Sequence, residues 1–276
     1  MKPPTTVAGL LRYARGRIEP GEAEQLLAHV LQRTRGWLYT HDDEAPPDRA
    51  REEFTALLMR RIAGEPLAYV VGRVGFRDFD LDVTPAVLIP RAETELLVEA
   101  ALASIPLDTP LQVADLGTGS GAIAIAIARE RPRARLVALD TSEAALEVAR
   151  ANAVRLDAPR IEFRLGDWFT PLAGERFDVI ASNPPYIADN DPHLQQGDLP
   201  YEPMLALASG VDGLAAIGHF VRTAPAYLQA GGRLLLEHGW QQGAAVRGLM
   251  ATAGFSQVLT LHDIEERERV TSGRRD

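Results

Sequence analysis

Apolar residues near the start of the chain recur every three or four positions, a spacing typical of amphipathic helices. One apolar stripe covers residues 7–18, a second covers 22–34, and a third, after a pair of prolines, covers 48–62. Stripes of this length bury their apolar faces against one another in a small bundle. We therefore predict an all-helical domain over residues 1–73.

The pattern then changes to partial alternation, which is typical of strands. Aromatic and aliphatic residues alternate with aspartates over residues 76–83, and Thr84-Pro85 marks a turn. Residues 87–89 form a short apolar run after that turn, and we interpret them as the second strand of a β-hairpin. The sequence thus predicts a hairpin linker over residues 74–91.

Short apolar runs alternate with helical stripes in the rest of the chain, residues 92–276. Repeated strand–helix units of this kind imply an α/β fold, with a mostly parallel, Rossmann-like sheet between two layers of helices. The runs that we predict to be strands are Gln112–Leu116, Arg135–Asp140, Ile161–Leu165, Phe177–Ser182, Arg233–Glu237 and Phe255–Thr260.

Composition narrows the chemistry. The 276 residues include no cysteine, which excludes disulfides, thiolate metal sites and cysteine nucleophiles. The six histidines do not have the clustered spacing of metal ligands, so we expect no catalytic metal. The sequence has no apolar run that could span a bilayer, and Met1–Thr6 lacks the features of a secretory signal, so we expect a cytoplasmic location.

Charge is unevenly distributed. The net charge is −9, and residues 91–276 carry 17 basic and 25 acidic side chains. So acidic a segment repels a nucleic-acid backbone unless a local basic patch overrides it. The charge therefore favours a substrate other than DNA or RNA.

A glycine-rich loop follows the first predicted strand of the α/β region. Ligands of such folds bind at the carboxyl ends of the strands, and glycines allow close backbone approach. The spacing Gly-x-Gly-x-Gly is one residue shorter than a dinucleotide fingerprint and fits an adenosyl-amino-acid ligand better; a tight turn without ligand is the alternative. Asp140 ends the next strand and is placed to accept from ribose hydroxyls. The predicted loop residues are Gly117, Thr118, Gly119, Ser120 and Gly121.

Two residues past the third predicted strand are further candidates for the cofactor site. Asp167 is placed to accept from an adenine amino group, and Trp168 to cover the ring. A solvated loop acid and a packed tryptophan are the alternative interpretation.

Asn183-Pro184-Pro185-Tyr186 follows a strongly apolar predicted strand. Prolines fix φ and remove N–H donors, leaving a rigid turn rich in acceptors that suits a substrate –NH₂ group. The lone pair of an amide or aromatic amine nitrogen is delocalised, so such a nitrogen is a poor nucleophile. Acceptance of both hydrogens by the Asn183 side-chain oxygen and the Pro184 carbonyl would aim the lone pair at a sulfonium methyl group. Tyr186 could stack on the planar group.

With these motifs, the sequence resembles the PrmC/HemK family of release-factor glutamine methyltransferases over nearly its whole length. Besides the tetrapeptide, the resemblance rests on several long and idiosyncratic segments. They are Gly64–Tyr69, Leu88–Glu95, Gly166–Phe169, Asp191–Asp198, Leu236–Gly243 and Arg269–Thr271.

The resemblance implies the function and the fold. The family uses S-adenosyl-L-methionine to methylate the glutamine side chain in the Gly-Gly-Gln motif of class I peptide release factors. It implies a seven-stranded class I methyltransferase domain whose last strand is antiparallel, here Arg269–Ser272, preceded by a helical domain that binds the release factor. The cofactor would contact residues 117–121, Asp140, Trp168 and Asn183, and the substrate glutamine residues 183–186. A monomer is the expected state.

Two other functions stay open at this point. A DNA or RNA amino-methyltransferase would present adenine or guanine amino groups to the same tetrapeptide. A non-catalytic binding module would have the same fold with a decayed site. Glu237-His238, at the end of a predicted strand, could be an acid–base pair, but we interpret it as a hydrogen-bonded structural pair.

Overall fold

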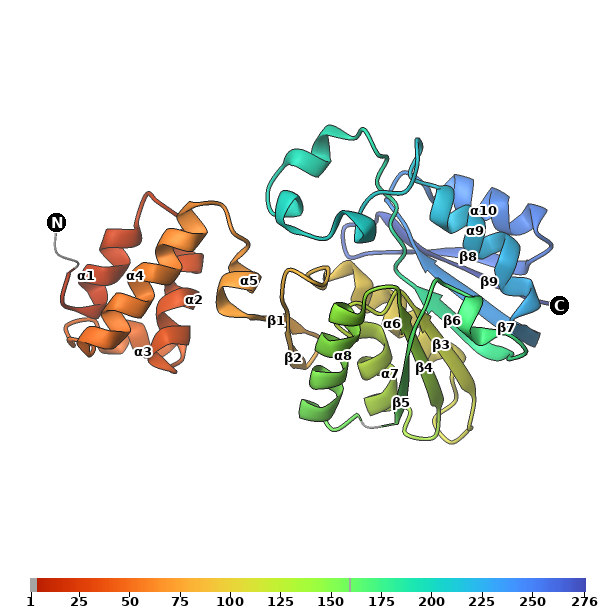
Figure 1. Cartoon of the computed structure of the whole chain (residues 1–276), viewed down its shortest axis with the longest axis horizontal. Coiled ribbons are helices and arrows are strands. Elements are labelled where there is room, and N and C mark those ends of the chain that lie inside the picture. The colour runs from red at the N-terminus through yellow and green to blue at the C-terminus, as the bar shows by residue number, and fades with distance from the viewer. Residues whose placement is uncertain (1–3, 159) are drawn as a thin grey trace. The chain divides into compact units, whose positions relative to one another are not determined.

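The computed structural model describes residues 4–158 and 160–276, and contacts between residues divide the chain into two units, Met1–Arg73 and Val74–Asp276. Figure 1 draws both units. Residues 1–3, which belong to the predicted helical domain, lie outside the described residues. The two units are described separately below.

The first unit is all-helical, as the three apolar stripes predict. Its short helices α3 and α5 fall in segments where no helix was predicted. Thr6 caps the first helix, since its hydroxyl accepts from the Gly9 backbone N–H at 3.2 Å. The helices are α1 (Val7–Ala14), α2 (Pro20–Leu31), α3 (Arg35–Thr40), α4 (Asp48–Ile62) and α5 (Leu67–Val71).

Aliphatic and aromatic side chains from α1, α2, α3 and α4 form one core in this unit. Leu10, Leu26, Leu38 and Phe54 are fully buried in it. Each side chain of this kind contributes about 1.5–3 kcal/mol when it leaves water. The core therefore gives the helical unit its own source of stability.

A hairpin of β1 (Arg73–Phe76) and β2 (Phe79–Asp82) follows the helical unit, and all of its residues except Arg73 belong to the second unit. The prediction of a strand at residues 87–89 was wrong. The chain turns earlier, at Arg77, whose φ of +52° is in the left-handed region. The Ile89 backbone N–H donates to the carboxylate of Glu202 at 3.1 Å instead of to a strand.

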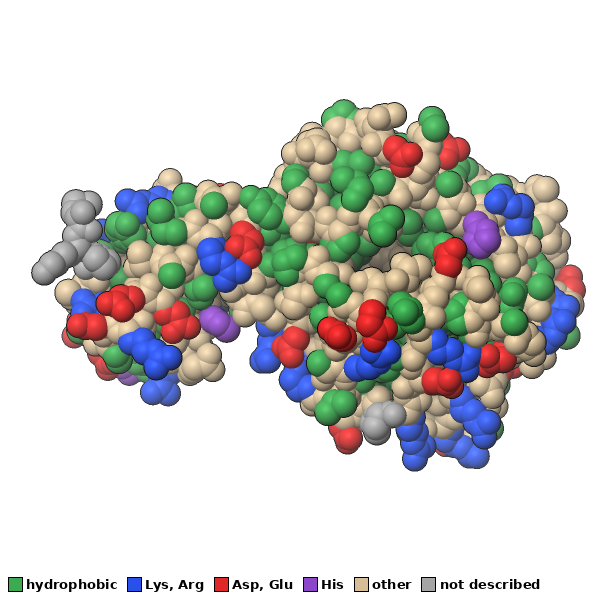
Figure 2. Space-filling view, viewed as in Figure 1, with side chains coloured by type: hydrophobic (Ala, Val, Ile, Leu, Met, Phe, Trp, Pro, Cys, Tyr) green, Lys and Arg blue, Asp and Glu red, His purple; other side chains and the backbone are tan. Residues whose placement is uncertain are grey.

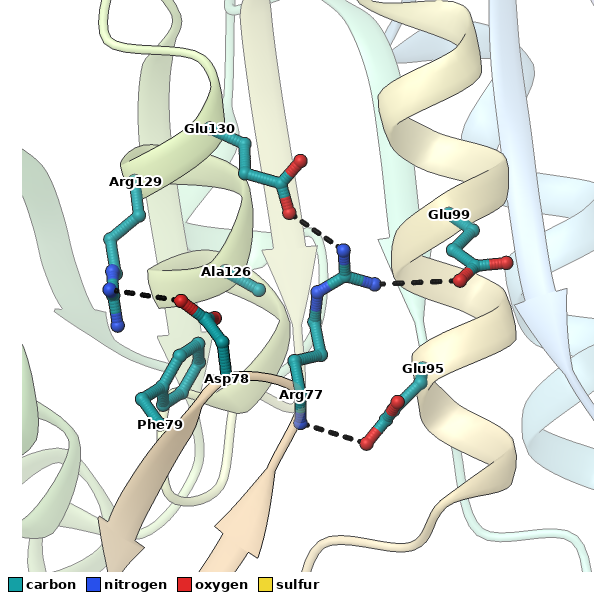
Figure 3. A pocket seen from close by; sticks show the side chains of 8 residues that line it. All are labelled: Arg77, Asp78, Phe79, Glu95, Glu99, Ala126, Arg129 and Glu130. Carbon is teal, nitrogen blue, oxygen red and sulfur yellow. Dashed lines mark hydrogen bonds and ion pairs between the residues drawn. The ribbon is translucent and has the colours of Figure 1, made fainter.

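Contacts with two helices hold the tip of this hairpin (Figure 3). The Arg77 backbone N–H donates to the Glu95 carboxylate at 2.8 Å, and its guanidinium pairs with Glu130 at 2.7 Å and with Glu99 at 3.8 Å. Arg129 pairs with Asp78 at 3.3 Å. A cavity of about 490 Å³ lies among these side chains, with charges of both signs around it. The ion pairs fix the hairpin against the helices, and the tetrapeptide is not part of this cavity.

The second unit is built on a seven-stranded sheet in the order β5-β4-β3-β6-β7-β9-β8 (Figure 1). All neighbours are parallel except β9, which is antiparallel to both β7 and β8. This confirms the fold class, including a last strand that runs antiparallel. The strands are β3 (Gln112–Leu116), β4 (Arg135–Asp140), β5 (Ile161–Leu165), β6 (Phe177–Ser182), β7 (Leu228–Glu237), β8 (Ser256–His262) and β9 (Glu268–Arg274).

Helices cover both faces of the sheet, and each face has its own buried core. One core contains side chains of α6, α7 and α8; the other contains side chains of α9 and α10. This arrangement leaves the carboxyl ends of the strands free to carry loops. The helices are α6 (Glu93–Ser104), α7 (Ala122–Glu130), α8 (Glu143–Arg155), α9 (Ala215–Thr223) and α10 (Gly243–Thr252).

Short 3-10 turns fill the loops. Three of them lie between β6 and α9, in the long segment after the tetrapeptide (Figure 1). The turns are η1 (Thr170–Leu172), η2 (Pro192–Gln195), η3 (Leu199–Tyr201), η4 (Met204–Ala206) and η5 (Ala224–Ala226).

Candidate active site

The glycine loop joins β3 to α7 at the carboxyl edge of the sheet. The backbone N–H groups of Gly117 and Thr118 both donate to the Leu139 carbonyl, at 2.9 and 2.8 Å. The Gly119 N–H donates to one Asp140 carboxylate oxygen at 2.9 Å, and the Ser142 N–H donates to the other at 3.0 Å. Asp140 therefore holds the glycine loop in place.

Asp115 is fully buried directly before this loop. One of its carboxylate oxygens accepts from the Thr118 hydroxyl at 2.6 Å and from the Ala124 N–H at 3.2 Å. The other oxygen has no hydrogen-bond partner among the described residues. Burial raises the pKa of this carboxyl to about 7. A buried acceptor with nothing to accept favours a donor supplied by a ligand.

Trp168, predicted to cover the adenine ring, lies against the glycine loop. A Cβ added to Gly117 would lie 3.3 Å from the indole atom Cζ3, so the ring rests on the loop backbone. The indole also makes an edge-to-face contact with Phe220, with ring centroids 4.7 Å apart. Asp167 has an exposed side chain, and its backbone carbonyl starts η1 by accepting from Thr170. The structure thus brings Trp168 to the loop and leaves the Asp167 carboxylate in solvent.

The tetrapeptide follows β6, the neighbour of β3 in the sheet. The Ser182 hydroxyl donates to the Leu116 carbonyl at 2.6 Å and joins the ends of the two strands. Asn183 therefore emerges beside the start of the glycine loop. Pro184 and Pro185 are buried, while Asn183 and Tyr186 are half-buried.

The Asn183 side chain is held from one side only. Its Nδ2 donates to the Thr94 hydroxyl at 3.1 Å, and that hydroxyl donates to Glu237 at 2.7 Å. The Asn183 Oδ1 and the Pro184 carbonyl have no hydrogen-bond partner within residues 4–158 and 160–276. Two acceptors thus stand free where the sequence analysis expected a substrate –NH₂ group.

Tyr186 is held in the same network. Its hydroxyl donates to Glu237 at 3.4 Å, and burial raises the pKa of this phenol above its usual value. Its backbone carbonyl accepts from the Gln242 amide at 3.0 Å, and a Cβ on Gly213 would lie only 2.3 Å from that carbonyl oxygen. Contacts from three segments therefore fix the ring and the turn that carries it.

Glu237 and His238 do not form the pair that the sequence analysis proposed; each bonds to other partners. Glu237 bonds to Thr94 and Tyr186, whereas the His238 Nε2 lies 2.8 Å from the Thr271 hydroxyl and its Nδ1 lies 3.0 Å from the Gly239 carbonyl. Burial raises the pKa of Glu237 to about 7 and lowers that of His238. Glu237 ends β7, and His238 continues the same line of backbone with its N–H bonded to the Arg269 carbonyl; consecutive residues of such a backbone point to opposite faces, which explains the separation.

Sequence reasoning missed Thr94. It lies 89 positions before Asn183, inside a segment that carried the family resemblance but had no chemistry assigned to it. A threonine in the first turn of a predicted helix has many local uses, and spacing alone gave no signal of its contact with the tetrapeptide.

A cavity of about 360 Å³ opens beside the tetrapeptide. Figure 2 shows a hollow on the face of this unit that is turned to the viewer, with hydrophobic side chains around it. The cavity has apolar walls together with several charged side chains, a mixture suited to a polypeptide. Its lining includes Asn183 and Tyr186, with Arg91, Glu93, Ile187, His193, Leu199, Leu207, Trp240, Arg267 and Arg269.

Within residues 4–158 and 160–276, no group of three or more His, Asp or Glu side chains could hold a metal ion. No helix in that part of the chain is long and apolar enough to cross a membrane.

The order of the sheet, its antiparallel strand β9 and the glycine loop after β3 define the class I methyltransferase fold. A model of the methyltransferase small domain matches residues 92–197, and a model of the PrmC N-terminal domain matches residues 8–72. The chain belongs to the release factor glutamine methyltransferase family. This confirms the resemblance stated from the motifs.

Three relatives support that membership. The release factor glutamine methyltransferase of Xylella fastidiosa (strain 9a5c) is 54% identical, with 98% of both chains covered. The enzyme of the same name from Pseudomonas aeruginosa is 46% identical over 98% of both chains. The one from Escherichia coli (strain K12) is 46% identical over 92% of this chain and 91% of its own.

Solved structures share the fold at low sequence identity. A methyltransferase from Pyrococcus furiosus has a TM-score of 0.50 and 16% identity, over 80% of this chain and 96% of its own. A 16S rRNA N2 G1207 methyltransferase from T. thermophilus has a TM-score of 0.52 and 21% identity, over 74% of this chain and 50% of its own. At these identities, the two structures show that the fold is shared and nothing more about this chain.

Proposed function

We propose that this enzyme transfers a methyl group from S-adenosyl-L-methionine to a glutamine side-chain amide, in the Gly-Gly-Gln motif of class I peptide chain release factors. One observation carries the proposal. Asn183 is anchored through its Nδ2, so that its Oδ1 and the Pro184 carbonyl remain free as a pair of acceptors. A primary amide has two N–H groups, and a pair of acceptors matches them.

The acceptors do most of the chemistry that the chain itself supplies. The lone pair of the amide nitrogen is delocalised into its carbonyl, so the nitrogen is a weak nucleophile. Hydrogen bonds from both N–H groups to Asn183 and Pro184 fix the nitrogen and aim its lone pair. Alignment and proximity of this kind supply much of a rate enhancement. The nitrogen sheds its extra proton after transfer, so no strong base is needed before attack.

The residues present fit S-adenosyl-L-methionine, which supplies an electrophilic methyl group on a sulfonium sulfur. Residues 117–121 provide the backbone cradle, and the free oxygen of Asp115 suits the ammonium group of an amino acid. Asp140 would accept from the ribose hydroxyls, and Trp168 would cover the adenine. The exposed carboxylate of Asp167 would accept a hydrogen bond from the adenine amino group.

We assign the helical domain, residues 1–73, to recognition of the release factor, the hairpin over 74–91 to linking, and residues 92–276 to catalysis. The observed unit boundary at Arg73 and the match of the PrmC N-terminal model to residues 8–72 support this division. We expect a cytoplasmic monomer with no nucleic-acid substrate. The excess of acidic side chains in residues 91–276 supports the latter expectation.

The test is a methyl-transfer assay with labelled S-adenosyl-L-methionine and purified class I release factors. Label should enter the wild-type factor and not a factor whose Gly-Gly-Gln glutamine is replaced by glutamate. Label that persists in the glutamate variant would exclude this site of methylation. Tight, salt-sensitive binding to DNA or RNA in a gel-shift titration would instead favour a nucleobase amino-methyltransferase.

A further inference from the structure

We propose that Thr94 and Glu237 are positioning residues that fix which end of the Asn183 amide faces the substrate. The proposal rests on the proposed function, because it explains how the amide comes to present its oxygen rather than its nitrogen. It adds two residues from α6 and β7 to a site otherwise made by the tetrapeptide.

The direction of the hydrogen bonds follows from counting hydrogens. An ionised carboxylate can only accept, so above its raised pKa of about 7 Glu237 takes the single hydroxyl hydrogen of Thr94, across 2.7 Å. The Thr94 oxygen then offers only a lone pair. The group of Asn183 that bonds to this lone pair must therefore be its –NH₂ group, which donates to the Thr94 oxygen across 3.1 Å. The Glu237 carboxylate, by accepting from Thr94, therefore turns the Asn183 –NH₂ group toward Thr94. The other end of the Asn183 amide, the acceptor Oδ1, is then left for the substrate.

The opposite orientation of Asn183 is unfavourable at both ends. Its oxygen would face the lone pair of Thr94, and its –NH₂ group would face the two N–H groups of the substrate amide. Donor would meet donor where the reaction needs an acceptor. Thr94 is 4% exposed and Glu237 is 1% exposed, so water has little access to repair the mismatch.

Groups on every side hold Glu237 in place. Tyr186 donates to its second oxygen at 3.4 Å. Glu93 on α6 disfavours its charge, and Arg269 on β9 favours it; these two side chains are themselves paired at 3.4 Å. The adjacent His238 is engaged with Thr271. Glu237 thus has hydrogen-bond donors for both oxygens and one cation near enough to support its ionised form.

The test compares three variants in the release-factor assay. Thr94→Val keeps the shape and removes the hydroxyl; Glu237→Gln keeps the shape and lets the bonds run in either direction. We expect each to lower kcat by roughly 10- to 100-fold, with KM for the release factor and Kd for S-adenosyl-L-methionine within about threefold of wild type. Thr94→Ser restores most of the lost turnover, because its hydroxyl bonds in the same direction.

Two controls separate positioning from damage to the fold. Thr252→Val removes a solvent-exposed hydroxyl that bonds within α10, and its kcat should equal that of wild type. The double variant Thr94→Val/Glu237→Gln should lose little more turnover than either single variant, because both interrupt the same chain of bonds. Additive losses, or a Thr94→Val enzyme with kcat within about twofold of wild type, would overturn the proposal.

A measurement without substrate makes the result independent of the proposed function. In ¹⁵N-labelled protein, the side-chain amide of Asn183, assigned by its absence in Asn183→Ala, should show one slowly exchanging proton. Thr94→Val should abolish that protection, and Thr94→Ser should keep it. Protection unchanged in Thr94→Val means that Thr94 does not hold Asn183, even if the enzyme proves to methylate another substrate. Lost protection together with an inactive wild type would refute the proposed function alone.

Discussion

The guanidinium of Arg91 donates to the carboxylate of Glu202, which stands 111 residues further along the chain. The Glu202 side chain has no exposed surface, and it also accepts from the backbone N–H of Ile89 at 3.1 Å. These bonds join the segment before α6 to the long loop after the tetrapeptide. Both segments contribute to the walls of the active-site cavity.

Loss of this ion pair should destabilise the protein. Arg91→Met leaves a buried carboxylate with only a backbone donor, and we expect the free energy of unfolding to fall by about 1–3 kcal/mol. Urea denaturation gives this value. Arg150→Met breaks the solvent-exposed pair with Glu143 and serves as the matched control, with an expected loss below about 0.5 kcal/mol. Equal effects of the two variants would show that burial of Glu202 is energetically unimportant.

Asn183→Ala should separate binding from turnover. The variant removes one of the two free acceptors but leaves the glycine loop and Asp140 unchanged. We expect kcat to fall by roughly 100-fold or more, while calorimetry gives a Kd for S-adenosyl-L-methionine within about fivefold of wild type. If turnover survived, the role of Asn183 in orienting the amide would be wrong.

Gly117→Ala should weaken cofactor binding. Its φ is +77°, and an added Cβ would lie 3.3 Å from the Trp168 ring that rests on the loop. Gly174 has a similar φ of +85° with open space around it, so Gly174→Ala carries the backbone strain alone. Both variants should lose about 1 kcal/mol of stability. Only Gly117→Ala should raise the Kd for S-adenosyl-L-methionine, by roughly tenfold; equal Kd values would remove the loop from the binding site.

Stability should depend on pH through Glu237. Burial raises the pKa of this carboxyl from 4.5 to about 7. At pH values between 4.5 and 7, the carboxyl therefore still carries its proton in the folded protein but has lost it in the unfolded chain. Folding is therefore progressively disfavoured as pH rises through that window. Glu237→Gln has no such proton, and its thermal midpoint relative to wild type should increase from pH 4.5 to 7. Asp115 titrates in the same range but is present in both proteins, so it cancels in the comparison. A constant difference would contradict the raised pKa.

The sequence revealed the elements whose periodicity is strong. The apolar runs of β3, β4 and β6 located the sheet, because strands buried on both faces are continuously hydrophobic. The glycine loop and the tetrapeptide could be recognised because each is a contiguous stretch with unusual composition. Periodicity failed at residues 87–89, where a tertiary contact from Glu202 to the Ile89 N–H replaces strand pairing.

Contacts between distant residues could not be predicted in this way. Thr94 and Glu237 lie 143 residues apart in the chain, and although both fall in segments that carried the family resemblance, nothing in either segment indicates that they contact each other. The pairing of Glu237 with His238 seemed natural in sequence because the two are neighbours. Their position on a strand separates them, and only the three-dimensional fold shows which partner each one has.

The place of β9 in the sheet has a consequence for biosynthesis. This strand comes after β8 in the chain, yet it lies between β7 and β8. During translation, β7 has an unpaired edge until residue 274 has emerged from the ribosome, and β8 has no partner to pair with before then. Exposed strand edges template aggregation, so this enzyme should need its chain held or shielded late in synthesis. A chain that ends before β9 would keep most of its active-site residues and still lack the strand that joins β7 to β8.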